Sequence, residues 1–177
     1  YAFYGRDVEN VTIPGGVTEI GKGVFAECKA LKNVVMQEGV TEIGLFTFQE
    51  CSALSTVTIP NSVKNIEVGV FDRCVGLTNI TVGKGNLEYS SLNGVLFDKK
   101  KTMLILYHKA KKGAYKIPNG VTSIESEAFK QSSGLTSITI PSSLKRIEAG
   151  AFGACVGLKS VTISEGVEVI DYKAVYG

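Results

Sequence analysis

An internal repeat constrains this chain more than any other feature of its sequence. Apolar residues recur at positions 0, 3, 5, 9, 12, 17 and 20 of a 23-residue unit, after which a new unit begins. Units that match at all seven positions begin at Val8, Leu31, Leu54 and Leu135. Agreement at so many spacings is not plausible by chance, so the pattern predicts a stack of equivalent coils.

Each repeated position has a structural meaning. Positions 3 and 5 lie on one face of a short strand, and the residue between them, most often Thr, points to the other face. All four prolines occupy position 6, which marks the strand's end because proline cannot donate to a strand ladder. Positions 9 and 12 indicate a second extended segment. Near the recurring Phe and Cys positions, apolar residues are spaced by about three, which predicts one helical or 3₁₀ turn in each unit.

The order of these residues resembles a known repeat family. The elements Leu-x-x-Ile-x-Ile-Pro, Val-x-x-Ile and Ala-Phe-x-x-Cys-x-x-Leu resemble the BspA-like leucine-rich repeats of bacterial surface proteins. The stretch from Tyr89 to Phe97, followed by a Lys-rich turn and Leu104 to Tyr107, resembles a variant of that family. The resemblance implies an extracellular or cell-surface protein, often an adhesin or another protein that contacts a host.

We therefore expect a right-handed leucine-rich-repeat solenoid, rich in β-structure, with short strands, one helical or 3₁₀ turn per repeat and an inserted β-hairpin. The handedness follows the family and the usual crossover preference. One domain over residues 1–177 is expected, with repeats that start near 8, 31, 54, 77, 112, 135 and 158, and the hairpin at about 94–111. Because the chain begins and ends inside repeats, we expect it to be a fragment of a longer protein.

The four cysteines share one position of the repeat. Cys28, Cys51, Cys74 and Cys155 all occupy position 20, which predicts a column of small buried side chains. A bridge such as Cys28–Cys51 remains open, since stacked neighbours lie within range, although parallel side chains disfavour it. A metal site is not expected because neither a Cys-x-x-Cys pair nor an adjacent His is present. No cofactor is expected either.

Positive charge is concentrated in the insertion. Residues 98–116 hold seven lysines and one aspartate, a balance of about +6. They predict a protruding hairpin with a basic turn, on whose surface His108 is expected to lie. The charge has two interpretations, a solvated turn that protects a sheet edge or a patch that binds a sulfated glycan or an acidic protein. The candidate patch comprises Lys99, Lys100, Lys101, Lys109, Lys111 and Lys112.

Small polar residues flank and separate the apolar strand positions. They predict one continuous outward sheet face, which is either a broad binding surface or simply a soluble β face. The face lacks the Tyr, Trp and Arg residues that usually anchor interfaces. The candidate surface comprises Asn10, Thr12, Asn33, Thr56, Thr58, Asn79, Thr81, Thr139 and Thr162, with Ser137 and Ser160 beside them.

The remaining sequence favours binding over catalysis. The net charge is only +2, and no aromatic platform accompanies the lysines, so neither a nucleic-acid partner nor membrane insertion is expected. No catalytic triad, carboxylate pair or phosphate loop stands out, so no enzyme is expected. The leading hypothesis is a binding module for a protein or glycan, for example in host extracellular matrix. The alternatives are an architectural spacer and a polyanion binder that acts through the Lys-rich hairpin.

Overall fold

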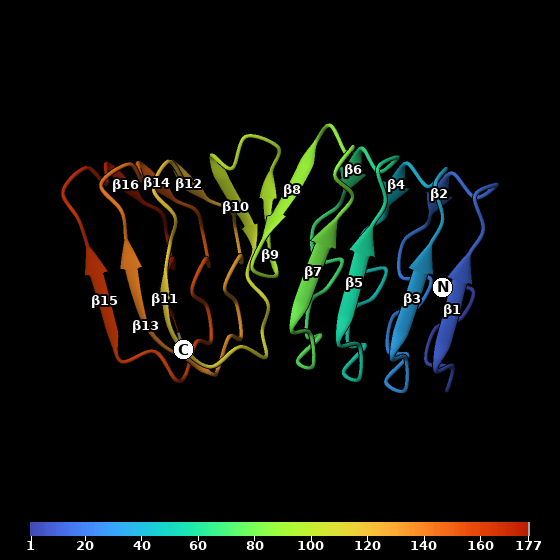
Figure 1. Cartoon of the computed structure of the whole chain (residues 1–177). Coiled ribbons are helices and arrows are strands. Elements are labelled where there is room, and N and C mark those ends of the chain that lie inside the picture. Colours follow the sequence, from blue (N-terminus) through green and yellow to red (C-terminus); the bar gives the residue numbers. More distant parts are fainter. Residues whose placement is uncertain (177) are drawn as a thin grey trace.

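The computed structural model describes residues 1–176, which form a solenoid of about seven coils (Figure 1). Each regular coil has a strand of about four residues on one side and a strand of two residues on the other. Turns connect the two sides, and each coil lies directly beside the next. The predicted stack of equivalent units is confirmed.

The N-terminal coils pair residue for residue with their copies. The longer strands form one parallel sheet in the order β1 (Asn10–Ile13), β3 (Asn33–Met36), β5 (Thr56–Ile59) and β7 (Asn79–Val82). The shorter strands form another: β2 (Glu19–Ile20), β4 (Glu42–Ile43) and β6 (Asn65–Ile66). Asn10 pairs with Asn33 and Ile20 with Ile43, so the registers equal the 23-residue repeat.

The C-terminal coils repeat this arrangement with the insertion built in. One parallel sheet contains β11 (Gly113–Lys116), β13 (Leu135–Ile140) and β15 (Ser160–Ile163). A second sheet runs in the order β16 (Val169–Ile170), β14 (Arg146–Ile147), β12 (Ser123–Ile124), β10 (Met103–Leu106), β9 (Val95–Asp98) and β8 (Tyr89–Leu92). Its first four strands are parallel to one another, whereas β9 is antiparallel to both of its neighbours, β10 and β8.

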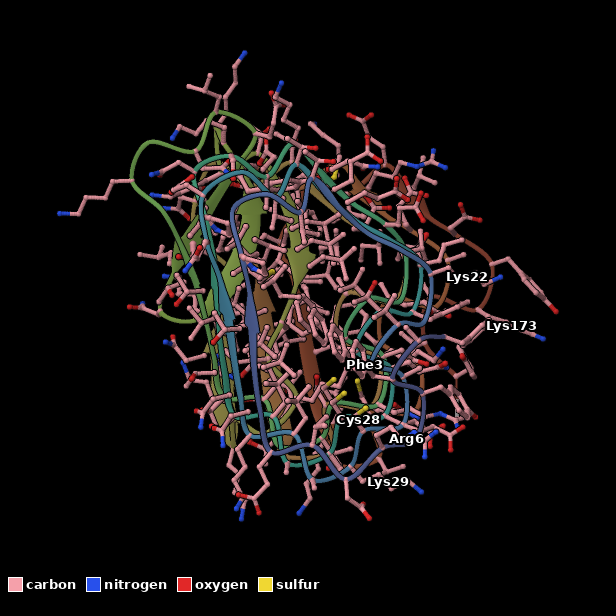
Figure 2. All side chains as sticks on the ribbon, turned by 90° about the vertical axis from the view of Figure 1, so that its right-hand side faces the viewer. Phe3, Arg6, Lys22, Cys28, Lys29 and Lys173 are labelled. Atoms are coloured by element: carbon pink, nitrogen blue, oxygen red, sulfur yellow. The ribbon has the colours of Figure 1, made fainter. Side chains whose placement is uncertain are left out.

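Columns of identical side chains fill the interior. The rings of Phe25, Phe48 and Phe71 stack with centroids 5.6 and 5.8 Å apart, and Phe3 extends the column at 5.3 Å. The predicted Cys column is also buried, and its thiols are free. In the view from the N-terminal side, the Cys28 sulfur lies inside the coil beside Phe3 (Figure 2). The repeated apolar positions are therefore the core of the fold.

The segment that carries Phe and Cys differs from the prediction in one detail. It is a run of hydrogen-bonded turns, and residues 1–176 contain no helix. The Ala26 N–H donates to the Gly23 carbonyl and the Cys28 N–H donates to the Phe25 carbonyl, as in a 3₁₀ turn. Glu27 interrupts this pattern with a φ of 60°, a left-handed conformation that cannot continue a right-handed helix.

The predicted inserted hairpin is present, but it does not simply protrude. Strands β9 and β10 pair antiparallel, β8 adds a third strand, and β10 pairs with β12 of the next coil. Val95 and Phe97 pack into the core of the C-terminal coils, whereas Leu96 packs into the core of the N-terminal coils. The insertion thus lies between two separate hydrophobic cores, and its alternating side chains pack into one core or the other.

Candidate binding surfaces

The polar face of the first sheet is built as the strand pattern predicts. Asn10, Asn33 and Thr58 are exposed, whereas the apolar strand residues beside them are buried or, at Val11, half-buried. The Asn33 amide donates to the Asn10 amide oxygen at 2.8 Å, and the Thr58 and Thr81 hydroxyl oxygens lie 2.9 Å apart. These contacts run along the stack, so each coil orders the polar side chains of the next.

The predicted face is not continuous, which corrects the expectation from the sequence. The insertion separates the sheet of β1, β3, β5 and β7 from the sheet of β11, β13 and β15. On the β7 edge, the Ile80 N–H donates to the Gly94 carbonyl of the insertion at 3.2 Å instead of to a following strand. Thr139 and Thr162 therefore belong to a separate sheet from the other candidate residues, and Thr139 is half-buried.

The candidate lysines do not form a single patch. Lys99, Lys100 and Lys101 lie in the turn between β9 and β10, at the upper edge of the solenoid in Figure 1. Lys99 donates to the Asn86 carbonyl, while the other two side chains extend into solvent. Lys111 and Lys112 precede β11, which starts at the lower edge (Figure 1). The two groups of lysines thus lie at opposite edges of the coil.

The expectation that Lys109 and His108 lie on the surface is wrong. Lys109 is 5% exposed, and its Nζ lies 3.4 Å from Asp72 Oδ1. Burial lowers the Lys109 pKa, and the Asp72 charge partly opposes this effect. Burial also lowers the pKa of His108, and the charge of Lys111 adds to that shift.

Residues 107–109 are buried because they form the inward turn of the inserted coil. The Tyr107 N–H donates to the Ala128 carbonyl, just as the Phe48 N–H, two coils earlier in the stack, donates to the Val70 carbonyl. Tyr107 takes the place of Phe and stacks on Phe129 with centroids 4.9 Å apart. The aromatic residue 22 positions before Phe129 was the signal that could have placed this turn.

A cleft between the coil of β6 and the inserted strand β10 was not foreseen. Its volume is about 400 Å³, and segments 66–72, 103–109 and 125–127 line it. Apolar side chains make up most of the lining, and the buried Asp72–Lys109 pair lies at one side. Nothing in the repeat predicts the cleft, because it exists only where the repeat is broken.

No metal centre or membrane-spanning helix emerges from the described residues. Within residues 1–176, no cluster of three or more His, Cys, Asp and Glu side chains could hold a metal ion. The same residues include no helix that is long and apolar enough to cross a bilayer. The candidate sites are therefore the polar sheet face, the exposed lysines and the cleft.

A family comparison accounts for the repeat. A model described as the BspA-type leucine-rich repeat region matches residues 1–101 and 106–177 in six copies. The chain belongs to this family. No sequence of a curated protein matches the chain.

Solved structures of bacterial proteins, several of them described as leucine-rich repeat proteins, share the fold. The pneumococcal vaccine antigen PcpA superposes with a TM-score of 0.85 at 27% identity, over 92% of this chain and 41% of that protein. A leucine-rich cell surface protein from Faecalibacterium prausnitzii gives 0.78 at 34% identity, over 89% of this chain and 42% of that protein. The chain thus spans about two fifths of the length of these relatives.

Proposed function

We propose that this chain is a non-catalytic, adhesin-like binding module displayed on a bacterial cell surface, where it contacts a protein or glycan of a host matrix. The observation that carries the proposal is the ordered polar face of β1, β3, β5 and β7. The likeness to a cell surface protein and to a vaccine antigen supports the location.

The sheet face has the properties of a preorganised binding surface. Its side chains are held by strands on a rigid core and by contacts with the next coil, so little conformational entropy is lost on binding. Val35, 54% exposed and in register with Thr12, adds an apolar spot among the polar residues. Such a surface can combine hydrogen bonds with local apolar contact.

The test is binding to immobilised host matrix proteins such as fibronectin, laminin and collagen. We expect the double variant Thr58→Arg, Thr81→Arg to weaken binding about tenfold or more, because two bulky charges would stand in the centre of the face. The matched control, Thr18→Arg with Thr122→Arg, introduces the same charges outside the strand face and should bind as the wild type does.

Equal binding by both double variants would reject the sheet face as the site. If the wild-type chain binds none of the matrix proteins, the result favours the architectural spacer, in which the solenoid only holds other domains apart.

A second candidate function rests on the turn between β9 and β10. Lys100 and Lys101 are exposed there beside Lys99, which suits a sulfated glycan or another polyanion. Replacing Lys99, Lys100 and Lys101 with Ser should shift elution from a heparin column to lower salt. The control is Lys111→Ser with Lys112→Ser at the opposite edge, which should shift elution less. Failure of the wild type to be retained at modest salt would remove this candidate.

A further inference from the structure

Backbone hydrogen bonds link each Phe-containing turn to the next coil, except at one place. The Phe25 N–H donates to the Thr47 carbonyl and the Phe48 N–H to the Val70 carbonyl, both at 2.9 Å. Among residues 1–176, the backbone N–H groups of Phe71 and Arg73 have no such acceptor. The ladder that joins the coils is therefore interrupted beside Phe71.

The strand on the same coil is also left without its next neighbour. β6 pairs with β4 on one side only. On its other side, the Ile66 N–H donates to the Tyr89 hydroxyl at 3.0 Å, where regular coils use a backbone carbonyl. The cleft thus lies beside an unpaired sheet edge, and its lining includes Phe71 with its unpaired amide. Such backbone groups can be satisfied by an added peptide strand.

The interior of the cleft suits a large apolar side chain. Its volume of about 400 Å³ falls within the range of small-ligand pockets. The apolar lining comes from both sides of the gap: Val70, Phe71, Leu96, Met103, Ile105 and Leu106. An apolar group that entered it would remove this lining from water.

The rim favours a positive charge beside that apolar group. Glu67, Glu125 and Glu127 line the cleft together with the Asp72–Lys109 pair. Lys130 forms an ion pair with Glu127 at 2.9 Å, whereas Glu67 and Glu125 form none within residues 1–176. Two carboxylates are therefore left without a cationic partner at the rim.

We propose that this cleft docks an extended peptide segment of a partner protein, in which a large apolar residue and a Lys or Arg two positions later share one face. The apolar side chain fills the cleft, and the basic group lies against Glu67 and Glu125. A carbonyl oxygen of the peptide accepts a hydrogen bond from the Phe71 N–H group. The site is separate from the face of β1, β3, β5 and β7.

The test is an NMR titration of the ¹⁵N-labelled chain with the capped peptide acetyl-Gly-Phe-Gly-Arg-Gly-amide. We expect a saturable shift of the Phe71 amide signal at millimolar or lower peptide concentration. Glu125→Lys should weaken binding about tenfold or more, since it reverses a rim charge. The matched control, Glu165→Lys, places the same change at an exposed site away from the cleft and should bind the peptide as the wild type does.

Two further peptides separate the contributions of shape and charge. Acetyl-Gly-Phe-Gly-Glu-Gly-amide and acetyl-Gly-Gly-Gly-Arg-Gly-amide should each bind at least about tenfold more weakly. The proposal is overturned if the Phe-Gly-Arg peptide causes no shift at millimolar concentration, or if all three peptides bind alike. Thr58→Arg with Thr81→Arg should leave the titration unchanged, so this result stands independently of the matrix-binding test.

Discussion

Cys51 and Cys74 lie in the interior with their sulfur atoms directed along the stack. Each thiol donates to the carbonyl of a Phe one coil earlier, Cys51 to Phe25 at 3.1 Å and Cys74 to Phe48 at 2.9 Å. Burial raises the pKa of Cys51 and raises that of Cys74 to about 12. Both thiols are therefore neutral and shielded at ordinary pH, which suits a packing role.

This environment predicts slow thiol chemistry. At pH 8 the folded chain should react with iodoacetamide at Cys51 and Cys74 at least about 100-fold more slowly than the urea-denatured chain. Mass spectrometry of peptides after timed labelling measures the rates, and the denatured chain, in which all four cysteines should react, is the control. Reaction at the denatured rate would show that the column is open to solvent.

The buried Asp72–Lys109 pair predicts a coupled effect on stability. Lys109→Met should lower the free energy of unfolding by about 3 kcal/mol, because it leaves the Asp72 carboxylate largely buried without its partner. Adding Asp72→Asn should restore most of the loss, since the orphaned charge is then removed. Urea denaturation of the two single variants and the double variant measures this cycle. Purely additive effects would mean that the two groups do not interact.

The pairing of Asp72 with Lys109 could not be predicted from the sequence, unlike the burial of the repeated side chains. Side chains on the repeat were placed correctly because each is fixed by its copies 23 residues away. Lys109 is outside that register, and its partner Asp72 is 37 residues away. A lysine flanked by His108 and Ala110 has the local appearance of a solvated residue, and only the inward turn at Tyr107 reveals its burial.

At the scale of elements, the aromatic column makes the stability of one coil depend on its neighbours. Phe48 is fully buried between Phe25 and Phe71, whereas Phe3 ends the column and is 48% exposed. Phe48→Ala should therefore cost about 3–5 kcal/mol, and Phe3→Ala clearly less. Chemical denaturation compares the two variants. Equal losses would contradict a column that is packed in the middle and open at its end.

Strands were easier to predict than turns and the insertion. Alternation at positions 3 and 5 defined the longer strands, and the hairpin of β9 and β10 followed from two apolar runs around a Lys-rich turn. The expected helical or 3₁₀ turn is a run of turns with 3₁₀-type hydrogen bonds. It does not extend into a helix because residues such as Glu27 adopt a positive φ, which side-chain spacing does not report. β8 was missed because Tyr-Ser-Ser-Leu lacks an alternating apolar pattern.

At the scale of the molecule, the insertion divides the solenoid into two cores and two outward faces. The composition of the sheet face could be predicted, since it follows from the residues between buried strand positions. The interruption of the face could not be predicted, because it depends on how the insertion meets the β7 edge. The cleft could not be predicted either, because it depends on how segment 66–72 meets segment 103–109 across a break in the repeat. The regular coils thus follow from the repeated sequence pattern, whereas the candidate cleft forms where the insertion breaks that pattern.

The central claim is that equivalent residues lie one coil apart in a regular stack, and spin-label distances test it most directly. One label at Thr12 is combined in turn with a second at Lys116, Thr139 or Thr162, which are register partners on β11, β13 and β15. Double electron–electron resonance should give three distances that rise by about 4.8 Å per step. Distances that stay constant or change irregularly would contradict the stack.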